Sequence, residues 1–387
     1  MNTSWWRSLE ELDKDQKAFI LLAPEGKHLL VGPPGSGKTN LLLLRAQYLA
    51  GRGEKNVLIL TFTKTLTDFI QSGIATKGLI KADQIRTYHS WASEHIMEHL
   101  GERIVTKGAE FDEEVRSTVV SKILAANDKA PSKQIYSAIF VDEAQDLTSA
   151  ELEALLVLSD KVCICGDGNQ GIYRRNGLEI AEKLGLQQHS LKRHYRIGQK
   201  IARIADRLIP PEHEELSLEA TSNYNPKVQG DSIATMTECA SRDEQFALML
   251  EKIRIQLLAY NEDTIGVICG ARETLSELRA RFDKTELADL VHVHKVDKNA
   301  TFNSERRIHV MTIHGSKGTE FRAVHMYGVE ELEPFPQRRT RLAYTAVTRA
   351  KTSLNAYRTG PTSHALENAF SEPTSFQIDE LFSNGEK

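Results

Sequence analysis

A glycine-rich turn between a predicted strand and a predicted helix constrains the fold more than any other feature of the sequence. Residues 31–40 read VGPPGSGKTN and directly follow the apolar run HLL. The spacing from Gly32 to Thr39 matches the G-x-x-x-x-G-K-[ST] phosphate loop, in which backbone N–H groups surround a phosphate and the lysine reaches its outer oxygens. Such a loop joins a strand to a helix N-terminus, so it predicts an α/β fold with a nucleotide at the edge of the sheet.

Two series of short apolar runs predict two sheets. Longer amphipathic segments separate the runs, an alternation that is typical of parallel α/β domains. We therefore expect one α/β domain at residues 1–192, with a small helical insertion at about 91–130, and a second at 193–387. The first series is HLLVG, NVLILTFT, SAIFVDEA and KVCICGD, and the second is SIATMT, TIGVICG, RIHVMTIH and VHMYGV.

The composition is that of an ordinary globular chain. The 387 residues are 40% hydrophobic and 26% charged, and the longest apolar runs are much shorter than a membrane span. We expect no membrane partner and, since the N-terminus lacks a cleavable hydrophobic segment, a cytoplasmic location. The formal charge of −4 argues against a basic coat over the whole surface but permits a local basic groove. The four cysteines are expected to be buried thiols.

An acidic motif completes the expected nucleotide site. The run AIFVDEAQD, residues 138–146, is an apolar strand that ends in two carboxylates. Asp142, with the hydroxyl of Thr39, suits the coordination shell of Mg²⁺, and Glu143 suits the polarisation of an attacking water. Together with Lys38, these residues predict hydrolysis of ATP rather than binding alone.

Further motifs carry a resemblance to one family. In chain order they are TFTKTL, RTYHSWA, DEAQD, GDGNQGIYRRNG, LKRHYR, TIHGSKGTEF and LAYTAVTRAK, and this is the order seen in UvrD/Rep/PcrA-like superfamily 1 DNA helicases. The resemblance runs from Gln16 to Lys351. It implies two RecA-like parallel-sheet domains with ATP and Mg²⁺ in the cleft between them, and a motor that acts on single-stranded DNA.

The resemblance implies roles on the adenine and ribose side of the nucleotide. Gln16 resembles the glutamine that reads the adenine edge, and Tyr195 resembles the tyrosine that stacks on the base. Glu320 resembles the glutamate beside the ribose and phosphates. The residues expected to bind ATP are Gln16, Gly35, Ser36, Gly37, Lys38, Thr39, Tyr195 and Glu320.

It also implies roles at the γ-phosphate. Gln170 resembles the residue that senses this phosphate, and Arg196 and Arg349 resemble two arginines that reach it from the second domain. Guanidinium suits that task because its charge is fixed and it grips phosphate in a bidentate way. For either arginine the alternative is a surface ion pair. The expected catalytic set is Lys38, Glu143, Gln170, Arg196 and Arg349.

Eight residues are expected, on the same resemblance, to contact the strand. Aromatic faces stack on unpaired bases, and hydroxyl or imidazole groups meet phosphates. For Phe62 and Tyr88 the alternative is packing in the core, and for His314 it is a structural role. The set is Thr61, Phe62, Thr63, Tyr88, His89, Tyr173, Arg175 and His314.

The chain departs from the family in one motif and in two intervals. Arg175 and Asn176 stand where family members usually carry tryptophan and arginine, which replaces a stacking ring by a guanidinium plane. The intervals 89–142 and 196–312 are too short for the accessory subdomains of full-size members. We therefore expect a nearly bare motor that works with a protein partner, either a nuclease or a subunit of a repair or phage-defence complex.

Two other functions fit part of the sequence. A regulatory ATPase that responds to DNA and controls a partner nuclease without unwinding would explain the short intervals and Arg175. A phosphate-loop NTPase with no nucleic-acid role would leave TFTKTL, RTYHSWA and TIHGSKGTEF without explanation. Strand displacement distinguishes the motor from the switch, and DNA-stimulated hydrolysis distinguishes both from the third.

Overall fold

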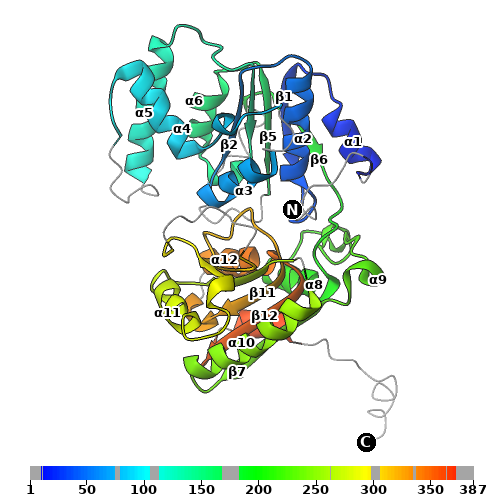
Figure 1. Ribbon diagram of the computed structural model, residues 1–387. Coiled ribbons are helices and arrows are strands. Elements are labelled where there is room, and N and C mark those ends of the chain that lie inside the picture. The colour runs from blue at the N-terminus through cyan, green and yellow to red at the C-terminus, as the bar shows by residue number, and fades with distance from the viewer. Residues whose placement is uncertain are drawn as a thin grey trace, which may run out of the picture.

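The computed structural model contains two α/β units, which lie one above the other in Figure 1. Each unit has a six-stranded sheet, and the strand pairs within both sheets are parallel. This confirms the predicted α/β class with two RecA-like parallel sheets. The structure describes residues 10, 12–74, 79–104, 113–167, 183–261, 263–297, 306–333, 337–362 and 364–371.

The first sheet has the strand order β3-β2-β4-β5-β1-β6. The four runs predicted for this half of the chain form β1, β2, β4 and β5, whereas β3 is only three residues long and β6 is a mostly exposed polar edge strand. The strands are β1 Gly26–Val31, β2 Val57–Thr61, β3 Ile85–Thr87, β4 Ala138–Val141, β5 Lys161–Gly166 and β6 Gln187–Ser190. The helices are α1 Lys14–Ile20, α2 Lys38–Gly51, α3 Lys64–Ile74, α4 Tyr88–Leu100, α5 Glu113–Lys129 and α6 Ser149–Leu156.

The second sheet has the order β7-β12-β11-β8-β10-β9. Its strands are β7 Ile233–Cys239, β8 Ile265–Cys269, β9 Val291–Val293, β10 Ile308–Thr312, β11 Phe321–Tyr327 and β12 Ala350–Thr359. Its helices are α8 Gln199–Leu208, α9 Pro226–Gln229, α10 Arg242–Ala259, α11 Glu273–Phe282, α12 Gln337–Val347 and α13 His364–Phe370.

Apolar side chains cover both faces of each sheet. Every residue of β2, β4, β8 and β10 is buried. Helices on both sides of a parallel sheet explain why these strands are continuous apolar runs rather than alternating ones. Two core clusters form in the first unit and two in the second. The two sheets are therefore packed on both faces, and residues at their strand ends form the candidate site.

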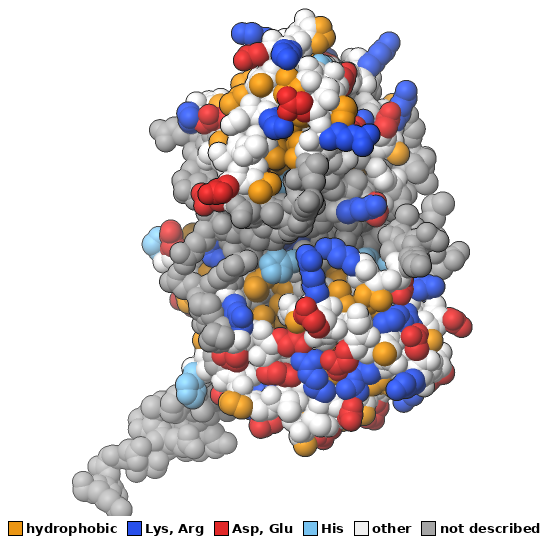
Figure 2. All heavy atoms as spheres, turned by 90° about the vertical axis from the view of Figure 1, so that its left-hand side faces the viewer, with side chains coloured by type: hydrophobic (Ala, Val, Ile, Leu, Met, Phe, Trp, Pro, Cys, Tyr) orange, Lys and Arg blue, Asp and Glu red, His pale blue; other side chains and the backbone are white. Residues whose placement is uncertain are grey.

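The surface of the second unit differs from its core in being densely charged. Acidic and basic side chains are intermixed over the face shown in Figure 2. Ion pairs link α10 to α11, for example Arg281 to Asp243 at 2.7 Å. No helix in the described part of the chain has the length and apolarity needed to cross a membrane.

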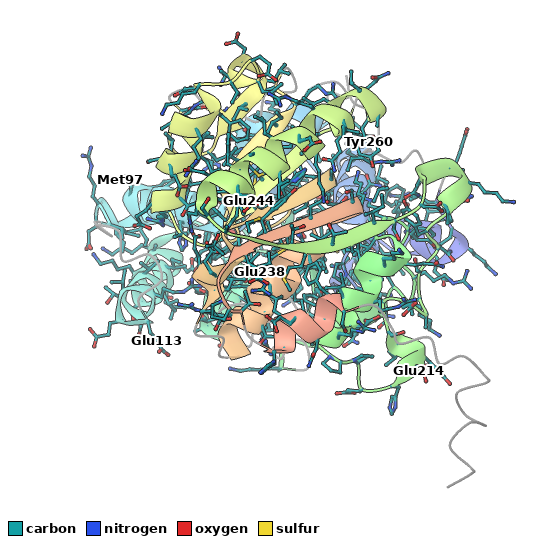
Figure 3. All side chains as sticks on the ribbon, turned by 90° about the horizontal axis from the view of Figure 1, so that it is seen from below. Met97, Glu113, Glu214, Glu238, Glu244 and Tyr260 are labelled. Carbon is teal, nitrogen blue, oxygen red and sulfur yellow. The ribbon has the colours of Figure 1, made fainter. Side chains whose placement is uncertain are left out.

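The helices α4 and α5 pack against each other beside the first sheet. They occupy the region in which a small helical insertion is expected. In Figure 3 the labelled Met97 and Glu113 mark this pair at one side of the molecule, while Glu244 and Tyr260 mark the two ends of α10 across the second sheet.

Candidate active site

The phosphate loop joins β1 to α2 at the carboxyl edge of the first sheet. Gly35 and Gly37 have φ angles of 74° and 87°, a left-handed conformation that glycine adopts without the steric penalty of a Cβ. Gly37 caps α2 without a side-chain hydrogen bond. The buried hydroxyl of Ser36 has no hydrogen-bond partner among the described residues. The Ser36 hydroxyl and the first backbone N–H groups of α2 are hydrogen-bond donors that a phosphate oxygen satisfies. The loop therefore fits a nucleotide.

Lys38 is held against the loop to which it belongs. Its Nζ donates to the carbonyl oxygens of Gly32 at 2.8 Å and Pro33 at 3.0 Å. A phosphate oxygen is a stronger acceptor for an ammonium group than a neutral carbonyl, because both partners are then charged. Lys38 is thus placed to exchange these two contacts for a nucleotide phosphate.

Thr39 and Asp142 meet at the sheet edge although they are far apart in the sequence. The Thr39 hydroxyl donates to Asp142 Oδ2 at 2.7 Å. Burial, and then the neighbouring charge of Glu143, raises the pKa of Asp142 to about 6. A divalent cation favours the carboxylate form, and Mg²⁺ commonly takes only one or two protein oxygens. The pair therefore fits the expected Mg²⁺ ligands.

A thiol that sequence reasoning did not assign also contacts Asp142. Cys165 Sγ lies 2.9 Å from Asp142 Oδ1, and the backbone N–H of Glu143 donates to the same oxygen at 2.9 Å. Both contacts fix the orientation of the carboxyl group. All four cysteines are buried and free, as predicted.

Glu143 follows directly in a left-handed backbone conformation, with φ of 53°. Non-glycine residues in this region carry a modest strain, which is concentrated at functional sites in many proteins. The Gln145 side-chain amide donates to Glu143 Oε2 and accepts the backbone N–H of Asp167 at 3.1 Å. Gln145 therefore orients the expected hydrolytic glutamate. The position of Gln145 within the DEAQD motif is the sequence signal that could have identified this role.

Gln16 and Tyr195 are far apart in the sequence, and both reach the phosphate loop. Gln16 Nε2 donates to the carbonyl oxygen of Ser36 at 3.1 Å, and Gln16 Oε1 accepts the N–H of Asp13 at 3.2 Å. The Tyr195 hydroxyl donates to Asp13, and its backbone N–H donates to the Gly35 carbonyl at 3.2 Å. The two expected adenine contacts thus lie beside the same turn.

Arg196 and Glu320 bring the second unit to this loop. A Cβ added to Gly35 would lie 3.5 Å from Arg196 Cβ. The Arg196 guanidinium lies 2.5 Å from Glu320 Oε2, and Lys351 Nζ lies 4.0 Å from the same oxygen. A cluster of cationic groups around one carboxylate therefore stands next to the phosphate loop.

Burial and charge act in opposition within this cluster. Burial raises the pKa of Glu320, but Arg196 and Lys351 outweigh it and hold that pKa below its ordinary value. Burial lowers the pKa of Lys351 to about 8, although Glu320 opposes the shift. No role is predicted for Lys351 from the sequence, although it is the last residue of the LAYTAVTRAK motif.

Arg349 is buried within the second unit. Its guanidinium donates to the carbonyl oxygens of Thr345 at 3.0 Å and Thr319 at 3.2 Å, and to the Thr348 hydroxyl at 3.2 Å. The structure therefore gives Arg349 backbone and hydroxyl partners in its own unit rather than a surface ion pair. Its carbonyl partner Thr319 is adjacent to Glu320.

Several expected strand contacts gather at the ends of β2 and β3. The rings of Phe62 and His89 lie 6.0 Å apart, and those of Tyr88 and His89 lie 5.7 Å apart. Tyr88 is only 1% exposed and Thr61 is 1% exposed. The Thr61 hydroxyl is within 2.7 Å of the Thr67 hydroxyl. In this structure Tyr88 occupies the core position that was its alternative.

Thr63 and His314 lie where the two units approach each other. The Thr63 hydroxyl donates to the Lys317 carbonyl at 3.5 Å, and His314 belongs to the turns that follow β10. Gln170, Tyr173 and Arg175 lie within 168–182, outside the described residues. The expected γ-phosphate sensor and two of the expected strand contacts therefore stay predictions from sequence.

Comparison with known proteins gives two family matches. Residues 15–176 match an AAA domain, and residues 307–357 match the UvrD-like helicase C-terminal domain. No curated protein matches the chain. A solved structure described as "The structure of PRRSV helicase" is similar at 15% sequence identity and a TM-score of 0.42. The match covers 89% of this chain and 54% of that one, so the chain spans about half the length of that structure.

Proposed function

Since the chain belongs to the UvrD-like superfamily 1 helicases, we propose that this ATP-hydrolysing, helicase-type enzyme is a motor on single-stranded DNA that works with a partner protein. We further propose that it hydrolyses ATP with Mg²⁺ through the residues described above. We also propose that residues 1–192 form an N-terminal RecA-like ATP-binding domain and residues 193–387 a C-terminal RecA-like domain.

One observation carries the proposal. Lys38, the Thr39–Asp142 pair and Glu143 converge on one edge of the first sheet, and Arg196 of the second unit stands against the same loop. A nucleotide bound at this edge touches both units. Hydrolysis and release of the γ-phosphate therefore change a contact that joins them, which is what a two-domain motor requires.

The chemical step uses residues of both units. Thr39 and Asp142 would hold Mg²⁺, which would supply charge neutralisation at the phosphates. Lys38 exchanges its two carbonyl acceptors for phosphate oxygens. Glu143, oriented by Gln145, polarises the attacking water. Arg196 exchanges the Glu320 carboxylate for the γ-phosphate and stabilises the charge that develops there.

Movement follows from where the strand contacts lie. Thr63 of the first unit and the turn containing His314 of the second unit are adjacent at the junction. A strand held from both units shifts relative to one of them each time the units close or separate. This couples the ATP cycle to stepping along DNA.

The compact second unit favours a second candidate function, a DNA-responsive ATPase that controls a partner nuclease. Between Arg196 and Thr312, the strands that the structure describes all belong to the second sheet. Within these described residues there is no additional sheet with which to grip a duplex. A strand-displacement assay distinguishes this switch from a motor that unwinds.

The steady-state ATPase rate, measured with and without single-stranded DNA, tests the proposal. We expect strong stimulation by DNA in the wild-type chain and loss of the rate in Glu143→Gln. A single-stranded RNA of the same sequence, used in parallel, reports the preference for DNA. A rate that is unchanged by either nucleic acid would contradict the proposed motor and the proposed switch alike.

A further inference from the structure

The segment between β10 and β11 is a series of tight turns that lies at the junction of the units. The N–H of Ser316 donates to the Thr312 carbonyl at 3.0 Å, and the N–H of Thr319 donates to the Ser316 carbonyl at 3.0 Å. The Gly315 N–H donates to the Thr312 hydroxyl at 3.2 Å. Because successive turns share these bonds, a displacement at one residue of the segment moves the others.

A buried ion pair fixes this segment to the first unit. Lys317 Nζ lies 2.5 Å and 2.6 Å from the two carboxylate oxygens of Asp146. The two side chains are 2% and 0% exposed. Breaking a buried pair leaves an uncompensated charge, which is far more costly than losing a surface pair. The segment is therefore bound firmly to the DEAQD turn.

Two further contacts align the segment with the end of β2 and the start of α3. The Lys317 carbonyl accepts the Thr63 hydroxyl at 3.5 Å. Gly318 has φ of 74°, and a Cβ added there would lie 2.6 Å from the Leu66 side chain. Only glycine permits this approach and this conformation together. The two backbones are thus held close beside an expected strand contact.

Asp146 is one turn away from the expected hydrolytic glutamate. Residues Ala144–Asp146 form a 3₁₀ turn that Glu143 caps, and the Asp146 N–H donates to the Glu143 carbonyl at 2.9 Å. On the other side of Lys317, Glu320 binds Arg196. The segment that begins at His314 thus reaches two of the groups that are expected to act at the γ-phosphate, Glu143 and Arg196.

We propose that Lys317 is a positioning residue that couples strand binding to ATP hydrolysis. Its ion pair with Asp146 transmits a displacement of the segment around His314 to the turn that carries Glu143. This inference rests on the proposed DNA-dependent ATPase. The physical path is one ion pair and one hydrogen-bonded turn, a contiguous network of the kind that carries coupling between sites.

Lys317→Met in the full chain tests the proposal, because it removes the charge and keeps the length of the side chain. The probe is an oligothymidine strand, and the quantity is the ratio of the strand-saturated ATPase rate to the strand-free rate. We expect this ratio to fall by about tenfold. The strand concentration that gives half-maximal stimulation should change much less, since both side chains of the ion pair are buried.

Three further variants separate coupling from folding. Lys317→Arg keeps the charge and should restore most of the ratio, and Asp146→Asn should lower the ratio as Lys317→Met does. In the Lys317→Met/Asp146→Asn double variant the two losses should not add. The control is Lys161→Met, which breaks the Lys161–Glu54 pair within the first unit and should keep the wild-type ratio.

The outcomes are distinguishable. A wild-type chain that DNA does not stimulate contradicts the proposed function itself. A stimulated wild type with an unchanged ratio in Lys317→Met, or in Asp146→Asn if the former does not fold, overturns the coupling role. A proportional fall of both rates together with a lower unfolding temperature assigns the pair to stability alone, and this also overturns it.

Discussion

Two glycine-containing turns lie at the carboxyl edges of the two sheets, and they differ in the side chains that contact them. The phosphate loop follows β1, and within the described residues its lysine donates to two neutral carbonyls of the loop. The turn at Gly270 and Ala271 follows β8 and precedes α11. Its two N–H groups donate to Glu331 Oε2 at 2.9 Å and 2.8 Å. A carboxylate of the protein therefore binds where a ligand anion would bind.

The carboxylates beside the second turn are also paired with an arginine. Arg242 pairs with Glu331, with Glu277 at 2.8 Å and with Glu330 at 3.3 Å. The Thr274 hydroxyl donates to Glu331 as well. The comparison shows that a parallel sheet offers an anion site at its edge, and that the side chains beside each turn decide whether it binds a ligand or stabilises the fold.

The largest expected effect tests whether the second unit acts at the first turn. Arg196→Ala should lower kcat about a thousandfold, as removal of an arginine that stabilises phosphoryl transfer does. The measurement is the steady-state rate of ATP hydrolysis at saturating nucleotide. Arg242→Ala is the matched control, since it removes an arginine of the second unit that faces the other turn. An equal loss of kcat in both variants would break the comparison.

A smaller loss is expected from the carboxylates that accompany the two turns. Glu143→Gln should lower kcat by about a hundredfold or more, because the amide cannot polarise water as a carboxylate does. Nucleotide affinity should persist in this variant. Glu331→Gln should leave kcat per folded molecule near the wild-type value. A large kcat defect in Glu331→Gln would show that the second turn takes part in catalysis.

Stability should respond in the opposite way. Glu331→Gln weakens charge-assisted hydrogen bonds to two backbone N–H groups and an arginine, and it should cost about 1–3 kcal/mol of unfolding free energy. Glu143→Gln should cost less, since Glu143 also raises the pKa of the buried Asp142. Denaturant unfolding of the two variants checks this order, and the reverse order would contradict the structural role of Glu331.

Acid sensitivity extends the comparison to a buried histidine of the second unit. Burial, and then His292, lowers the pKa of His294 from 6.5 to about 3. Between these values the unfolded chain binds a proton that the folded chain does not. Stability from this group is therefore complete above pH 6.5 and decreases as the pH falls, by about 1.4 kcal/mol per pH unit.

The measurement is the unfolding free energy of the wild type and of His294→Asn at pH 7.5 and pH 5.5. The wild type should lose more stability on acidification than the variant. Equal losses of unfolding free energy would mean that His294 takes up its proton in the folded chain as well. Neutral, buried His294 would then not contribute to stability at neutral pH.

The sequence predicts the parts of this molecule that depend on local pattern. The runs of β1, β2, β4 and β5 are apolar because both faces of the sheet are covered, and these strands are where the pattern places them. The Thr39–Asp142 contact also follows, since the phosphate loop after β1 and the acidic end of β4 lie at the same carboxyl edge of one parallel sheet.

Other contacts between separate elements could not be predicted. Edge strand β6 is polar and lacks the strand pattern. The Lys317–Asp146 pair and the binding of Glu331 by the turn at Gly270 join residues from separate elements whose approach only the fold determines. The side-chain amide of Gln16 also caps α1, and its sequence motif does not indicate this second role.

The most direct test is the number of nucleotides bound per chain. Equilibrium dialysis with a non-hydrolysable ATP analogue and Mg²⁺ should give one molecule per chain, lost in Lys38→Met and retained in Glu331→Gln. That result would place the nucleotide at the first turn alone. Two molecules per chain, or binding that survives Lys38→Met, would contradict the assignment of the two turns.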